Sequence, residues 1–174
     1  MIIIGEKVYL RAIEASDNEM LLAMMNDPET ERMLGGSSRP LSAEDQLRWF
    51  QTLSNNERTL RCIVVRKEDD KAVGTVILSD IDMKNGCAQI HIKLSDGARG
   101  KGCGSEAIST MVDYAFHELR LHSVYAEVLA YNTVSQKAFE KCLFKKDGLL
   151  RSRVYKNGQY ADVIAYSIVK GLDR

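Results

Sequence analysis

The chain has 174 residues, of which 45% are hydrophobic and 28% are charged, which is typical of a soluble folded protein with one domain. Lysine plus arginine and aspartate plus glutamate each total 24, so no net positive charge is present to attract nucleic acid. No run reaches the roughly 20 apolar residues of a membrane span, and the four cysteines lack metal-ligand spacing. We therefore expect a cytoplasmic protein without a membrane partner, a nucleic-acid partner or a metal site.

Apolar periodicity and turn residues divide the first third of the chain into a strand, two helices and the loops between them. Asn26-Asp27-Pro28 ends the first helix, because proline cannot continue one. The glycine and serine residues that follow predict a flexible loop before the second helix, which can shape a pocket. The expected elements are a strand at 7–13, a helix at 16–25, a loop at 35–40 and a helix at 42–53.

The rest of the chain alternates short strands with two more helices. Three strands joined by turns predict an antiparallel meander, and the strand that follows the next helix is its crossover partner. Asn132 caps the last helix, and the turn at 156–159 closes a final hairpin. The expected strands lie at 60–67, 72–79, 87–94, 123–129, 149–155 and 160–169, and the expected helices at 107–119 and 132–143.

A glycine-rich loop joins the third strand of the meander to the next helix. It carries Gly100, Gly102 and Gly104, with Arg99 and Lys101 beside them. Glycine leaves the backbone amides bare and permits positive φ, so that successive amides can surround an anion at the helix N-terminus. The order of residues fits neither a Walker A loop nor a dinucleotide fingerprint. From the loop alone, a phosphate site and a plain connecting turn are both open.

The sequence pattern Arg99-x-x-Gly102-x-Gly104 resembles the pyrophosphate-binding motif of the GNAT superfamily of N-acetyltransferases. Further similarity lies in Asn132-x-x-Ser135 and in the segment 157–162, which reads Asn-Gly-x-Tyr-x-Asp. The element order is similar to the family's over the whole chain. The likeness is greatest to the branch that acetylates ribosomal-protein N-termini and to its relatives acting on spermidine.

The resemblance implies a single acetyltransferase domain over residues 1–174. Its fold would be mixed, of the α+β kind. The family's fold is a strongly twisted, mostly antiparallel sheet of about seven strands, splayed at the middle, with about four helices on its faces. Because family members often pair, the resemblance also implies a homodimer.

The resemblance implies transfer of an acetyl group from acetyl-CoA to a primary amine by direct attack in a ternary complex. The acceptor would be a protein N-terminal α-amine, a polyamine or another small amine. In the family the loop amides hold the pyrophosphate, the strand before the loop pairs with the pantetheine arm, and the next helix start lies across the gap. The implied cofactor-binding residues are Ile92, Lys93, Leu94, Arg99, Gly100, Lys101, Gly102, Cys103, Gly104, Ser105, Asn132, Ser135 and Phe139.

The catalytic residues depart from the family's pattern. Gln89 stands where many relatives carry a glutamate base, and His91, on the same strand face, is the candidate base, with a hydrogen-bonded structural histidine as the alternative. Phe139 stands where many relatives carry a tyrosine acid, which leaves Ser135 or water as the proton donor. Asn132 could equally be a plain N-cap. Candidate amine-binding carboxylates, which could also be surface or turn residues, are Asp80, Asp82 and Asp162.

The missing glutamate and tyrosine keep a second hypothesis open, namely a non-catalytic acyl-CoA-binding or regulatory module on the same fold. A nucleotide-binding protein unrelated to CoA is disfavoured, because the Walker and dinucleotide patterns both fail. The first hypothesis predicts thiol release from acetyl-CoA in the presence of an amine. The second predicts CoA binding without turnover.

Overall fold

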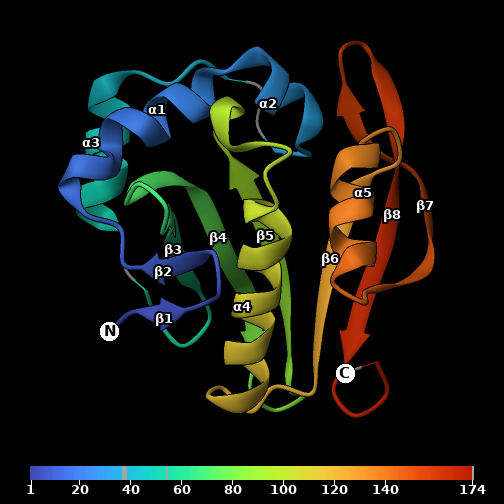
Figure 1. The fold of residues 1–174 in the computed structure, drawn as a ribbon. Coiled ribbons are helices and arrows are strands. Elements are labelled where there is room, and N and C mark those ends of the chain that lie inside the picture. The colour runs from blue at the N-terminus through green and yellow to red at the C-terminus, as the bar shows by residue number, and fades with distance from the viewer. Residues whose placement is uncertain (37–38, 54, 174) are drawn as a thin grey trace.

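The computed structural model describes residues 1–36, 39–53 and 55–173. Residues 37 and 38, in the middle of the predicted loop at 35–40, lie outside the described residues. Figure 1 shows one twisted sheet with helices on both of its faces. None of the helices in the described part of the chain has the length and hydrophobicity that crossing a membrane requires.

The sheet has eight strands in the order β1-β2-β3-β4-β5-β6-β8-β7. All neighbouring strands are antiparallel except β5 and β6. The predicted mostly antiparallel, mixed fold is therefore confirmed, with one short N-terminal strand more than expected. The strands are β1 (Ile3–Ile4), β2 (Val8–Arg11), β3 (Leu60–Arg66), β4 (Lys71–Asp82), β5 (Cys87–Leu94), β6 (Ser123–Leu129), β7 (Lys145–Lys156) and β8 (Gln159–Val169).

One helix was not expected from the sequence. Asp27 and Pro28 do end the first helix, but they also begin the next: the Asp27 carboxylate accepts a hydrogen bond from the Thr30 amide at 2.7 Å, and Pro28 occupies the first turn. Proline is favoured there because that amide has no helical acceptor anyway. The helices are α1 (Asn18–Asn26), α2 (Pro28–Met33), α3 (Ala43–Thr52), α4 (Cys103–His117) and α5 (Thr133–Lys141), with short 3-10 turns η1 (Ala15–Asp17) and η2 (Asp96–Ala98).

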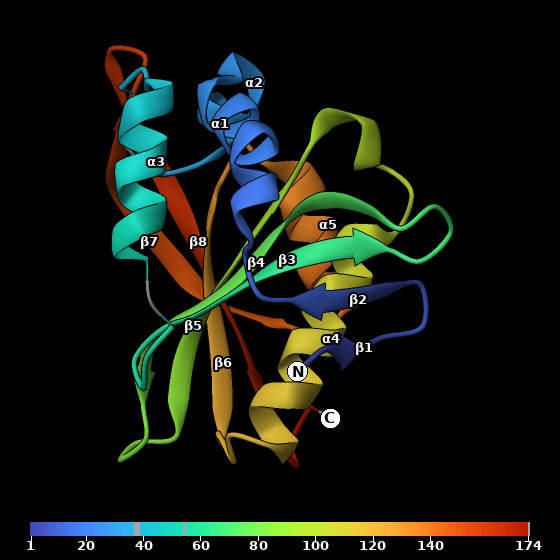
Figure 2. The ribbon, with the colours of Figure 1, turned by 90° about the vertical axis from the view of Figure 1, so that its left-hand side faces the viewer.

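The main core lies between the sheet and the two helices α4 and α5, which cover one of its faces. Ile108, Met111, Val112 and Phe116 of α4 are fully or almost fully buried there against alternate residues of the strands. α1 and α3 lie on the opposite face, where a smaller cluster forms around Leu21 of α1 (Figure 2). The strand residues between the core positions therefore face α1 and α3.

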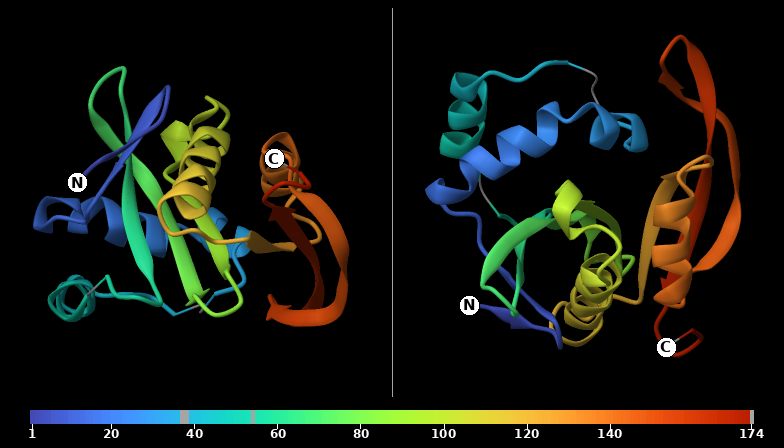
Figure 3. Two further views of the ribbon diagram at one scale, coloured as in Figure 1. Left: turned by 90° about the horizontal axis from the view of Figure 1, so that it is seen from below. Right: turned by 45° about the horizontal axis from the view of Figure 1, so that its top comes forward.

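The sheet is splayed between β5 and β6, as expected. These two parallel strands are paired only at their starts, through Cys87–Gln89 and Ser123–Tyr125. Beyond these pairs the strands separate, so the molecule forms two arms that diverge towards the ends of β5 and β6 (Figures 1 and 3). The second half of β5 consequently has a strand neighbour on its β4 side only.

A bulge in β4 fixes the end of β5 and the start of the glycine loop. The register between β3 and β4 shifts at Val64/Val65, which leaves Val73 outside the pairing. The Val73 carbonyl accepts hydrogen bonds from the amide and the hydroxyl of Ser95, at 2.9 and 3.1 Å. Gly74 lets the strands approach so closely that an added Cβ would lie 2.1 Å from the Lys93 carbonyl oxygen.

Candidate active site

The glycine loop presents a row of free amides at the start of α4. Gly100 and Gly102 have φ of 75° and 83°, a left-handed conformation that favours glycine. The amide of Arg99 closes η2, and the amide of Glu106 makes the first bond of α4 to the Gly102 carbonyl. No backbone amide from residue 100 to residue 105 donates a hydrogen bond to a described part of the chain.

The glycines of this loop border open space on the side where a side chain would stand. A Cβ added at Gly97, Gly100 or Gly102 would meet nothing within 4 Å, and at Gly104 it would meet only the Leu94 side chain, at 3.2 Å. α4 has 15 residues, so its dipole adds positive potential at this end. Bare amides, open space and a helix N-terminus together fit a diphosphate group.

The two cations predicted at the loop differ in their surroundings. Lys101 is exposed. Arg99 instead turns towards the start of α2, where its guanidinium donates to the Thr30 hydroxyl at 2.5 Å and lies 3.7 Å from the Asp27 carboxylate. A third contact, 3.3 Å, joins it to Asp96. Arg99 therefore ties the loop to α2.

The end of β5 lies beside the opening between β5 and β6, and its side chains alternate between the two faces of the sheet. Ile92 and Leu94 pack against the core on the α4 side. Lys93 lies on the other face, and its ammonium is 2.7 Å from the sulfur of Met25 in α1. The β5 segment predicted to meet the pantetheine arm therefore has an edge without a strand neighbour towards β6.

Asn132 and Ser135 lie at the start of α5, across the splay from β5. The Asn132 side chain accepts a hydrogen bond from the Ser135 amide at 3.0 Å and donates one to the Met33 carbonyl of α2, also at 3.0 Å. Asn132 is thus an N-cap that also binds α2. The Ser135 hydroxyl makes no hydrogen bond with the described residues, which leaves it available to a ligand.

Phe139 and Cys103 are buried, each with 2% exposure. The Phe139 ring packs against Phe144 and Tyr166, with centroids 5.0 and 6.4 Å away. Burial and a hydrogen bond to Glu140 raise the pKa of Tyr166 to about 12, so it stays neutral. The Phe139 ring is therefore part of the core, and Cys103 contributes its backbone amide to the row in the loop.

His91 lies on the α1 side of β5, on the same face as Gln89, as its alternation predicted. Its Nε2 is 2.8 Å from the Ser79 hydroxyl, which in turn is 3.3 Å from the Asp80 carboxylate. Burial lowers the pKa of His91 below its ordinary value, and the charges of Asp80 and Glu127 oppose that shift. At neutral pH the imidazole is therefore uncharged and can accept a proton.

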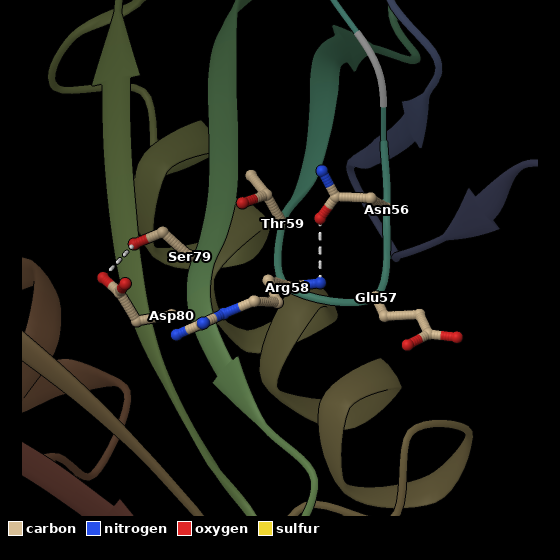
Figure 4. Close-up of a pocket in the computed structure, with 6 residues that line it drawn as sticks. All are labelled: Asn56, Glu57, Arg58, Thr59, Ser79 and Asp80. Atoms are coloured by element: carbon tan, nitrogen blue, oxygen red, sulfur yellow. Dashed lines mark hydrogen bonds between the residues drawn. The ribbon is translucent and has the colours of Figure 1, made fainter.

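A depression of about 610 Å³ lies next to the Ser79–Asp80 end of this chain of contacts (Figure 4). Asp80, which lines this depression, lies at the bulge between β4 and β5. Its backbone is in the left-handed conformation there, with φ of 50°. The rim of the depression carries two carboxylates, Glu57 and Asp80, and one guanidinium, that of Arg58. Its other lining residues are Asn56, Thr59 and Ser79.

The remaining two candidate carboxylates have structural partners. Asp82 accepts hydrogen bonds from the amides of Lys84 and Asn85, which lower its pKa and make it a turn residue. Asp162 accepts a hydrogen bond from the Ser152 amide at 2.7 Å. Of the three carboxylates named from the sequence, only Asp80 lies beside His91.

Two features of the site were missed by sequence reasoning. Tyr125 and Glu127 of β6 face the same side as His91, and the alternation of β6 could have placed them there. The other feature is α2, which crosses the splayed end of the sheet (Figure 1). A Glu31–Lys156 ion pair and a 2.7 Å hydrogen bond from the Tyr131 hydroxyl to the Arg32 carbonyl attach its far end to the second arm.

Comparison with known proteins identifies relatives of this chain. The sequence model of the acetyltransferase (GNAT) domain matches residues 7–145. An uncharacterized N-acetyltransferase, p20 of Bacillus licheniformis, is 32% identical over 167 residues, which cover 95% of this chain and 94% of that protein. The spermidine N(1)-acetyltransferase of Vibrio cholerae is 26% identical, with 91% of each chain covered.

A solved structure has the same fold. The crystal structure of spermidine N-acetyltransferase from Vibrio cholerae in complex with CoA and spermine superimposes with a TM-score of 0.85. It is 24% identical and covers 94% of this chain and 96% of that one. With the family model spanning most of the sequence, the chain belongs to the GNAT family of acetyltransferases.

Proposed function

We propose that this enzyme transfers the acetyl group of acetyl-CoA to a primary amine by direct attack in a ternary complex. The observation that carries the proposal is the row of amides from residue 100 to residue 105, which have no acceptor in the described part of the chain and lie at the N-terminus of α4. A diphosphate is the chemical group that such a row binds best. Acetyl-CoA supplies an activated thioester when it is bound.

The residues on the two sides of the splay would hold the rest of the donor. The backbone of Ile92–Leu94 has an edge that no strand pairs with on the β6 side, and an amide-containing pantetheine arm can use it. The Ser135 hydroxyl lies opposite, at the start of α5, and would give a proton to the leaving thiolate. Asn132 would act mainly by fixing the position of Ser135, since its amide accepts the Ser135 N–H.

His91 would remove a proton from the acceptor. The nitrogen must be neutral to attack, which costs about 1 kcal/mol at neutral pH for an α-amine and about 4.6 kcal/mol for a lysine-like or polyamine amine. An uncharged imidazole beside Asp80 and Glu127 suits this task, because the carboxylates attract the incoming ammonium and the imidazole accepts its proton. Positioning of the two reactants would supply much of the remaining rate.

A polyamine is the acceptor class that the charges favour. The charges of Asp80 and Glu127 act on His91, and the adjacent depression has two carboxylates, Glu57 and Asp80, against one guanidinium, that of Arg58, so a second ammonium of the same molecule can bind there. The relationship to a spermidine N(1)-acetyltransferase at 26% identity supports the same choice. A protein N-terminus carries a single ammonium and would use fewer of these carboxylates.

Measuring thiol release from acetyl-CoA with spermidine, spermine, short N-terminal peptides and an aminoglycoside tests the proposal. We expect the highest kcat/KM with a polyamine, and a reduced preference for it in the Asp80→Asn variant. Faster turnover of the peptides would overturn the polyamine assignment alone. Tight CoA binding with no turnover on any amine would overturn the catalytic proposal.

A further inference from the structure

Lys93 places a second nitrogen nucleophile beside the proposed donor site. It lies between Ile92 and Leu94, in the part of β5 that has left its pairing with β6. Its side chain is on the α1 face of the sheet, the same face as His91, while its neighbours point to the core. The primary amine of Lys93 is therefore on the acceptor side of the strand that borders the donor.

The environment of this amine does not stabilise its charge. Within the described part of the chain, its polar contact is the Met25 thioether at 2.7 Å, and no carboxylate lies within ion-pair distance. Sulfur of this kind is a weak acceptor. Burial lowers the pKa of Lys93, which increases the neutral fraction that can act as a nucleophile.

Other lysines with polar contacts show the contrast. Lys156 is buried as well, but it forms an ion pair with Glu31. Lys71 is 73% exposed and lies 3.8 Å from the Asp69 carboxylate. Lys67 and Lys170 donate to the carbonyls of Gly5 and Phe116. Lys93 thus combines partial burial, a thioether neighbour and a position at the splay.

We propose that Lys93 is acetylated by acetyl-CoA bound to its own chain when no acceptor amine is present, an inference that rests on the proposed function. The neutral Nζ of Lys93 attacks the thioester carbonyl carbon, a C–N bond forms and the C–S bond breaks. CoA leaves as the thiolate, which takes up the proton that the nitrogen loses. The products are an N-acetyl-lysine side chain and free CoA, and no other reactant is needed.

The test is to incubate the purified full chain with acetyl-CoA alone and to follow it by intact-mass measurement and peptide mapping. We expect one acetyl group per chain, located at Lys93, with a first-order rate that does not change with protein concentration. Spermidine should slow the modification, because it competes for the same face and consumes the donor. Lys93→Arg should stay unmodified, and its thermal unfolding midpoint establishes that it is folded.

Lys71→Arg is the matched control, since Lys71 is exposed and lies outside the site. This variant should be acetylated at Lys93 like the parent chain. Acetylation spread over exposed lysines, or a rate proportional to protein concentration, would overturn the inference. If Lys93 stays unmodified in the incubation with acetyl-CoA alone while a separate assay shows spermidine turnover, this inference is overturned and the proposed function is left intact, whereas failure to bind acetyl-CoA would overturn both.

Discussion

Gly102 is the residue on which the donor loop depends most. It is the N-cap of α4 and has φ of 83°, and its added Cβ would meet nothing within 4 Å. Gly102→Ala therefore introduces backbone strain of about 1–2 kcal/mol without a steric clash. We expect the strain to lower the unfolding free energy of the variant by that amount, or the loop to change its conformation. In either case CoA should bind more weakly, which calorimetry measures.

Gly97→Ala is the matched control for this prediction. Gly97 lies in η2, directly before the loop; its added Cβ also meets nothing within 4 Å, and its φ is not in the left-handed region. We expect its unfolding free energy and its CoA affinity to stay close to those of the parent chain. Equal CoA affinity in the Gly102 and Gly97 variants would remove the loop conformation from the proposed donor site.

His91→Gln tests the imidazole as a base. Burial holds the pKa of His91 below 6.5 in the folded chain, so the rate of the parent enzyme should fall on acidification only below that value. The variant should be slower and should lack this acid limb in its pH–rate profile. An unchanged profile in His91→Gln would show that another group, or water, takes the proton.

The same pKa direction makes a prediction about stability. The unfolded chain takes up a proton on His91 near pH 6.5 and the folded chain only at lower pH, so acidification below 6.5 favours unfolding. The stabilisation is present above that pH and is lost progressively below it. Urea titrations should show a steeper loss between neutral and acid pH in the parent chain than in His91→Gln.

Single residues differ in how far the sequence could place them. The face of His91 follows from strand alternation, and the bare loop amides follow from glycine spacing, so both could be predicted. The partners of Arg99 could not, because Thr30 and Asp27 are distant in sequence and belong to an unexpected helix. Asn132 caps α5 and lies at the splay, as the sequence predicted. Its hydrogen bond to the Met33 carbonyl of α2 could not be predicted, because α2 was not expected.

At the level of elements, α2 is held to both arms of the sheet. Arg99 binds its start, and Lys156 of the final hairpin pairs with Glu31 near its end. Lys156 is 4% exposed and Glu31 is 25% exposed, so the ammonium is the more desolvated partner. Neutralising Glu31 alone leaves a buried ammonium without its counter-charge. This loss therefore lowers the unfolding free energy more than removing both charges does.

We expect Glu31→Gln to lower the unfolding free energy by about 1–3 kcal/mol, less than a fully buried pair because Glu31 is partly hydrated. Lys156→Met should cost less, and the double variant should not lose the sum of both. Denaturant titration of the double-mutant cycle measures this, with Lys146→Met on the exposed part of the same strand as control. Additive losses would contradict the coupling between α2 and the hairpin.

Elements were predicted well where periodicity is long, and poorly where they are short. The meander and β6 carry clear periods and appear within three residues of the expected positions, whereas α4 begins four residues earlier than expected, at Cys103. α2 has six residues, too few for a period, and its Asp-Pro start was interpreted only as a stop. β7 begins at Lys145, earlier than expected, because bulges at Lys146/Gly148 and Leu150/Val154 interrupt its alternation.

At the level of the whole molecule, binding of the donor should stabilise the fold by mass action. Acetyl-CoA at about 100 times its Kd should add about 2.7 kcal/mol, which for a domain of this size raises the Tm by about 5–10 °C. The amides of Ile92–Leu94 and of the glycine loop should gain protection from hydrogen exchange. Stabilisation without protection at these positions would place the donor elsewhere.

The overall topology was largely predictable, since short connections join antiparallel neighbours and a helix must join the parallel pair. The degree of opening between β5 and β6 was not, because it depends on where the pairing ends, at Gln89 and Tyr125.

The edge strand β7 is interrupted by bulges and carries several lysines and arginines. Both features discourage pairing with another sheet edge.

The short ladder between β5 and β6 divides the sheet into two bodies of unequal size that are joined along a narrow seam. Three residue pairs carry the backbone pairing across it, and contacts of α2 and the buried core carry the rest. Mild denaturant should loosen this seam before either body melts, because local openings begin where the fewest bonds must break. Acetyl transfer should consequently disappear at a lower urea concentration than the far-ultraviolet signal of the helices and strands.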